Sequence, residues 1–98
     1  MNEQAPTERP PQRVVCAALR HKETGRIVAG ARHYDDIMRA QIAATEGYKS
    51  WLAADQGFID QFGVYLSREE AHVIATAQEQ IRRRCGGDAK RLYSENLY

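Results

Sequence analysis

Residues 56–78 constrain the fold most, because they join a β-type segment directly to a strongly signalled helix start. Ser67 is a good N-cap residue, and Glu70 stands three positions later, which is the spacing of a capping box. The segment 58–66 alternates imperfectly between apolar and polar side chains around a glycine, which predicts two short strands joined by a turn. A strand pair that runs straight into a helix beginning at Arg68 is therefore expected.

A first β-hairpin is predicted for residues 13–32. The run VVCAAL is apolar on both faces, and the segment RIVAGAR supplies the second strand. Gly25 can take a positive φ at the turn between them. Gly30 lies inside the second strand, where a glycine indicates a bulge or a close approach of another part of the chain.

Two helices are predicted, one after each strand pair. Residues 33–44 begin with two aspartates that favour a helix start and carry the mostly apolar stripe Ile37, Met38, Gln41, Ile42. Residues 68 to about 83 form the second helix, with Gly86 and Gly87 as its end. Its inner stripe is Ala71, Ile74, Ala75, Gln78, Ile81. The tail LYSENLY carries apolar side chains that are expected to dock onto the rest of the chain.

The order ββα, ββα predicts an α+β fold with a small antiparallel sheet from two β-hairpins and two main helices. Residues 1–12 hold all three prolines and are expected to be a disordered N-terminal arm. Residues 13–98 then form a single ligand-binding domain. A folded part of this size buries only roughly 60–65% of its unfolded surface, so assembly as a homo-oligomer is expected.

Composition disfavours several classes of function. Fourteen basic residues stand against 13 acidic ones, which counts against a DNA-binding protein. There is no run of eighteen apolar residues and no signal-peptide pattern, so neither a membrane partner nor export is expected. The histidines and cysteines show no metal-ligand spacing, and Cys16 and Cys85 are expected to be free thiols. Neither a metal, nor a cofactor, nor a catalytic residue is predicted.

The best candidate site lies at the start of the second helix. Arg68 and His72 are four residues apart and share one helical face beside the amino end, which attracts anions. A phosphate site is one interpretation of this pattern. The other, of equal weight, is a pair of exposed helix residues in which Arg68 pairs with a neighbouring glutamate.

Three other features have plainer explanations that weigh more. Tyr34 follows two basic residues at a strand-to-helix junction, where a ring can stack on a nucleobase, although packing onto the core is favoured on spacing alone. The arginines at positions 82–84 are favoured as a solvated helix end. The acidic pairs 35–36 and 69–70 are favoured as helix-start residues over acid–base catalysts.

The motifs GARHYDDIM, DQGFIDQFGVYLSREEAHVIA and LYSENLY together resemble the phage anti-Thoeris sponge family, of the first-described type. The resemblance covers residues 13–98. It implies a non-catalytic phage protein of the host cytoplasm that binds cyclic ADP-ribose isomers intact and so keeps the defence effector off. It also implies dimers or hexamers with pockets at subunit interfaces, and in some members a separate anti-CBASS site for cyclic oligonucleotides.

The resemblance assigns site residues by the family's helix-start pattern Asp-Arg-x-x-x-Arg, which aligns with Ser67, Arg68 and His72. Arg68 carries over as a phosphate ligand. Ser67 replaces the acidic residue, and His72 replaces an arginine with a ring that donates one hydrogen bond when neutral. The ring expected to stack on adenine is Tyr34, with Phe58 or Trp51 behind it.

An alternative function is a phage protein-binding module that inhibits a host protein. It would use the tyrosines and leucines of the tail together with the basic residues 82–84. A nucleic-acid-binding accessory protein is a third possibility, which the near-neutral charge disfavours.

Overall fold

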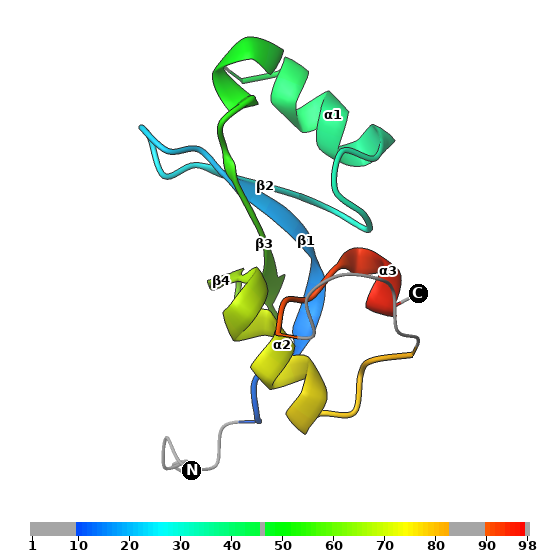
Figure 1. Cartoon of the computed structure of the whole chain (residues 1–98). Helices are drawn as coiled ribbons and strands as arrows, with labels where there is room; N and C mark the ends of the chain where they lie inside the picture. Colours follow the sequence, from blue (N-terminus) through cyan, green and yellow to red (C-terminus); the bar gives the residue numbers. More distant parts are fainter. Residues whose placement is uncertain (1–9, 46, 83–89, 98) are drawn as a thin grey trace, which may run out of the picture.

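A four-stranded antiparallel sheet forms the centre of the protein in the computed structural model, which describes residues 10–45, 47–82 and 90–97. The strand order is β2-β1-β3-β4 (Figure 1). The strands are β1 (Val14–Arg20), β2 (Ile27–Gly30), β3 (Asp55–Asp60) and β4 (Tyr65–Ser67). The helices are α1 (Asp36–Ala43), the 3-10 helix η2 (Tyr48–Trp51), α2 (Arg68–Ala77) and α3 (Ser94–Leu97). The predicted α+β class, its two hairpins and its two main helices are confirmed.

Both hairpins form as the sequence predicts. In the first, Gly25 has φ +75°, and the turn is closed by the bond from the His21 N–H to the Arg26 carbonyl at 2.8 Å. Gly30 allows a close approach, as expected, because the carboxylate of Asp35 occupies the space that a Cβ at Gly30 would need. The antiparallel pairing of β1 with β3 then joins the two hairpins into one sheet.

The core lies on one face of this sheet. Gly30, Ala17, Phe58 and Leu66 are paired across the four strands in one row, and all four are buried. α1 packs beside β2, while α2 packs beside β3 and β4 at the other end of the molecule (Figure 1). The row therefore supplies a continuous apolar surface to both helices.

α1 begins at Asp35, whose side chain accepts a bond from the Met38 N–H at 2.8 Å. Met38 and Ile42 are buried, as predicted. Ile37 is not: it is 63% exposed, so its place on the predicted apolar stripe is wrong. Trp51 fills the space beyond α1 instead, fully buried, with its indole N–H donating to Thr45 Oγ1 at 3.0 Å. The chain around Trp51 is the ordered 3-10 helix η2.

α2 ends at Ala77, several residues before the predicted end near residue 83. Glu79 takes φ +57°, and the N–H groups of Glu79 and Gln80 bond to the carbonyls of Thr76 and Ala75, which is a Schellman ending without glycine. The Gln80 side chain then pairs with both backbone groups of Val14, at 2.9 and 2.8 Å. The helix stops here because Gln80 is held by β1. The predicted terminators Gly86 and Gly87, with Cys85, lie outside the described residues.

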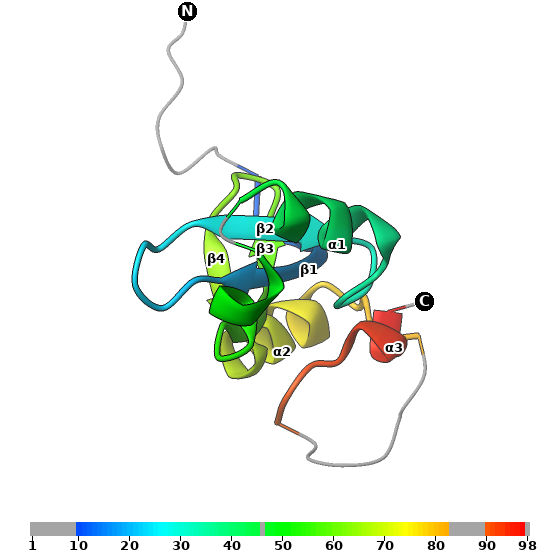
Figure 2. The same cartoon turned by 90° about the horizontal axis from the view of Figure 1, so that it is seen from above.

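The tail docks onto the body, as expected. α3 lies beside α2 in both views (Figures 1 and 2), and the Arg82 N–H bonds to the Asn96 carbonyl at 2.7 Å. Leu92 and Leu97 are buried in the main core. Residues 1–9 of the predicted arm lie outside the described part. Its last two residues are anchored, because Gln61 donates to the Pro11 carbonyl and Gln12 donates to Asp60.

Candidate functional site

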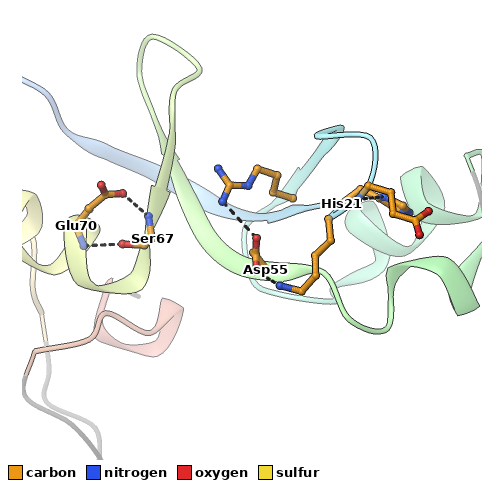
Figure 3. Close-up of polar contacts among 7 residues, drawn as sticks. His21, Asp55, Ser67 and Glu70 are labelled. Carbon is orange, nitrogen blue, oxygen red and sulfur yellow. Dashed lines mark hydrogen bonds and ion pairs between the residues drawn. The ribbon is translucent and has the colours of Figure 1, made fainter.

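The start of α2 has the predicted capping box (Figure 3). Ser67 Oγ accepts from the Glu70 N–H at 3.0 Å, and Glu70 Oε1 accepts from the Ser67 N–H at 2.8 Å. The box satisfies two backbone donors that an incoming anion could otherwise use. Anion binding at this helix start would therefore depend on side chains more than on the helix end itself.

An open groove of about 590 Å³ lies beside this helix start. β4 pairs with β3 only over residues 57–59, so the first two residues of β3, Asp55 and Gln56, have no β4 partner. The groove opens at this uncovered edge. It is lined by Arg20, Ala54, Asp55, Gln56, Tyr65, Ser67, Arg68, Glu69, Arg91 and Tyr93.

Arg68 is half-buried in the groove, and its direct partners are neutral. Its guanidinium donates to the Leu92 carbonyl at 2.7 Å and to Gln56 Oε1 at 2.9 Å, and it lies over the Tyr93 ring at 4.6 Å. Within the described residues, no carboxylate lies within ion-pair distance of it. Burial lowers the pKa of Arg68, because the cation has lost hydration that no direct anionic partner replaces.

The two other arginines of the groove each have a carboxylate partner. Arg20 lies 3.3 Å from Asp55, which Lys22 also contacts at 2.6 Å (Figure 3). Hydrogen bonds, first from Lys22 and then from Arg20, lower the pKa of Asp55. Arg91 lies 3.3 Å from Glu69. The uncompensated positive charge of the groove is therefore centred on Arg68.

Two tyrosines complete the lining, and each lies against an arginine. The Arg20 guanidinium covers the Tyr65 ring at 4.3 Å, reaching across β3. Gly57 makes this contact possible, since a Cβ there would lie 2.6 Å from the Tyr65 hydroxyl oxygen and would collide with the Leu66 carbonyl. Tyr93 is half-buried and has Arg68 on its ring. Such cation–π pairs hold the guanidinium groups in place at the groove wall.

The structure brings together only part of the predicted site. Ser67 and Arg68 both line the groove. His72 is half-buried on α2 but is not part of the groove lining. Tyr34 has φ +61° and packs against the core, which is the plainer of its two interpretations.

The choice of Phe58 as a stacking residue is wrong for this structure. Its side chain is fully buried in the sheet row, and the His33 ring lies nearly perpendicular to it with the ring centroids 5.3 Å apart, so no ligand can reach it. Trp51, the second reserve candidate, is also fully buried. In both cases burial in the core explains the aromatic residue, and no binding role is needed.

Sequence reasoning missed most of the groove: Arg20, Asp55, Gln56, Tyr65, Arg91 and Tyr93. Two signals were present. Gly57 inside a strand marks a close approach, here by Tyr65. The apolar tail was expected to dock, and Tyr93 lies within it, next to Leu92, whose N–H bonds to the Arg68 carbonyl at 3.0 Å.

Among the described residues, no group of three or more His, Cys, Asp or Glu side chains is placed to hold a metal ion. No helix in the described ranges has the length and apolar character needed to cross a membrane. Cys16 is a free, half-buried thiol, and burial raises its pKa.

Comparison with protein families gives one match. The family model described as the phage T4 y16D protein matches residues 13–98. The chain belongs to this family of phage proteins. The match extends over both hairpins, α2 and the docked tail, and so includes every residue that lines the groove. The search of curated proteins found no match, and neither did the search of solved structures.

Proposed function

We propose that this phage protein binds a cyclic nucleotide immune signal without cleaving it, and so keeps the host effector inactive. The signal would be a cyclic ADP-ribose isomer or a cyclic oligonucleotide, and the protein would act in the host cytoplasm. Membership of a phage protein family and the resemblance to anti-Thoeris sponges support the biological role. The groove supports the binding chemistry.

The observation that carries the proposal is the charge state of the groove at Arg68. A half-buried guanidinium whose direct partners are all neutral, within residues 10–45, 47–82 and 90–97, is a ready site for an anion. An arriving phosphate would form a charge-assisted hydrogen bond and replace the lost hydration. Such bonds to charged groups contribute about 1.5–3 kcal/mol each.

The rest of the lining fits a nucleotide. Arg20 and Arg91 can contact further phosphate oxygens, and Gln56 offers an amide for a ribose or base. The Tyr93 ring is half-exposed and is our candidate for stacking on the base, in place of Tyr34. Because the groove is open, we infer that a second copy of the chain closes it, in a dimer or a hexamer.

The structure gives less support to the alternative function, a protein that inhibits a host protein. It would use the apolar tail to hold a partner, but Leu92 and Leu97 are buried within the protein's own core. Of the basic residues 82–84, Arg82 is exposed, and the other two lie outside the described part. Among the described residues of the tail, Lys90, Arg91 and Glu95 are exposed and Tyr93 is half-buried, whereas Ser94 and Asn96 are buried.

A ligand-recovery experiment tests the proposal. The protein is mixed with cyclic ADP-ribose isomers and with cyclic di- and trinucleotides, free ligand is removed, and the complex is heated to denature the protein. Recovery of unaltered ligand is the expected result. Recovery of a cleaved product would indicate an enzyme instead, and recovery of no ligand would favour the protein-binding alternative.

A further inference from the structure

His33 is a titratable group that the proposed binding chemistry does not use. It lies between β2 and α1, is half-buried, and its ring is nearly perpendicular to that of Phe58. Its Nε2 lies 2.7 Å from the Gly57 carbonyl oxygen. A carbonyl oxygen only accepts hydrogen bonds, so Nε2 is assigned the ring proton, and Nδ1 is the atom that gains a proton when the ring becomes charged.

His33 and Arg68 are hydrogen-bonded to consecutive residues of β3. The His33 ring donates to the carbonyl of Gly57, and the Arg68 guanidinium donates to the side chain of Gln56. Neighbouring Cα atoms are about 3.8 Å apart, so the His33 ring and the Arg68 guanidinium are held at one short stretch of strand. The histidine is therefore bonded to the residue of β3 that directly follows Gln56, and Gln56 lines the groove.

α3 supplies the other charge that faces the ring. Glu95 of α3 lies 3.5 Å from Arg32, the residue directly before His33. The charged groups around His33 are thus Arg68 from α2, Glu95 from α3 and Arg32 from its own segment. Burial, and after it the charge of Arg68, lowers the pKa of His33, while Glu95 and the carbonyls of Gly57 and Ala18 act more weakly in the opposite direction.

We propose that His33 and the groove form one proton-linked unit, in which an anion bound at Arg68 causes His33 to take up a proton. In the empty protein the positive charge of Arg68 disfavours the charged form of the His33 ring. A bound anion cancels that charge and so removes the effect. Imidazolium keeps its bond to Gly57 and gains an oppositely charged neighbour. The inference rests on the proposed function only in requiring that an anion occupies the groove at Arg68.

The linkage fixes the direction of the pH effect. Affinity is constant at pH values where His33 is neutral in both the empty and the bound protein. It rises as pH falls through the pKa of the bound form, and it levels off below the pKa of the empty form. Each unit by which the ligand raises this pKa strengthens binding about tenfold at acid pH.

The first test needs no ligand. The pKa of His33 is measured by NMR in the wild type, in Arg68→Gln and in the control Arg91→Gln, which removes a groove arginine already paired with Glu69. We expect Arg68→Gln to raise this pKa toward 6.5, the usual value, and Arg91→Gln to change it little. An unchanged pKa in folded Arg68→Gln overturns the proposal. If Arg68→Gln does not fold, the pKa of His33 is measured in Glu95→Gln instead. Removal of this carboxylate should lower the pKa of His33, and an unchanged pKa overturns the proposal.

The second test uses cyclic ADP-ribose, whose pyrophosphate has no terminal phosphate group and stays ionised between pH 5 and 8. Calorimetry at pH 6 in two buffers of different ionisation heat gives the protons taken up on binding. We expect uptake in the wild type and none in His33→Gln. Binding without uptake overturns the proposal and leaves the proposed function intact. Absence of binding counts against the proposed function, and the ligand-free pKa measurement then decides the proton linkage alone.

Discussion

The guanidinium of Arg68 lies over the ring of Tyr93, with its Cζ 4.6 Å from the ring centroid. These two residues are far apart in the sequence, and their contact fastens the tail to the start of α2. The same contact leaves Arg68 with a π face and two neutral oxygens as partners. The contact between Arg68 and Tyr93 therefore helps to shape the groove, and it gives Arg68 a neutral partner that leaves the positive charge of the guanidinium uncompensated.

Tyr93→Leu should weaken binding of the cyclic nucleotide. Stacking of a base on an aromatic ring contributes roughly 1–3 kcal/mol, so the Kd should rise by about 5- to 150-fold. Tyr93→Phe, which keeps the ring, is the matched control and should bind nearly as the wild type does. Isothermal titration calorimetry on the folded variants measures both. Equal affinity of the leucine and phenylalanine variants would remove Tyr93 from the stacking role.

Arg68→Gln should raise the Kd more than tenfold, because it removes the groove's uncompensated charge. Arg91→Gln is the control: its side chain is exposed and paired with Glu69, so its loss should cost less. Titrations are run alongside thermal melts, since Arg68 also holds the Leu92 carbonyl. Similar losses in the two variants would show that binding follows total charge and not the position of Arg68.

Local sequence signals predicted the parts of the fold that depend on a few neighbouring residues. The capping box of Ser67 and Glu70 and the hairpin turn at Gly25 are set within four positions of the chain, and both are present. Arg68 was placed correctly at the helix start for the same reason. These features follow from backbone donors that any fold must satisfy.

Features set by distant contacts were not predictable from the sequence. α2 ends at a Schellman turn in which Glu79 replaces the expected glycine, because Gln80 binds Val14 of β1. The sequence predicts Phe58 as an accessible ring, yet pairing with Ala17 and Leu66 puts it on the core face. The groove depends on where β4 stops and where the tail docks, and neither is encoded within one segment.

Gly57→Ala should destabilise the fold and disorder the Arg20–Tyr65 wall of the groove. The new Cβ would collide with the Leu66 carbonyl and lie 2.6 Å from the Tyr65 hydroxyl oxygen. Overpacking of this kind costs about 1–3 kcal/mol. Gly25→Ala is the comparison, since no atom lies within 4 Å of its Cβ position and only its positive φ is strained. The free energy of unfolding in urea gives both costs, and a loss of ligand affinity is expected for Gly57→Ala alone.

Protein stability should fall as the pH is lowered below 6.5, because of His33. Burial and Arg68 lower the pKa of His33 in the folded protein, so the unfolded chain binds its proton first. The free energy of unfolding therefore decreases from about pH 6.5 down to the folded-state pKa, and the loss is complete below it. The carboxylates of Asp35 and Asp55 have pKa values lowered from 3.8, so they affect stability only at more acid pH. Urea titrations between pH 4.5 and 7.5 should show a smaller decrease for His33→Gln than for the wild type. Parallel curves for wild type and His33→Gln would show that His33 titrates alike in the folded and unfolded chains.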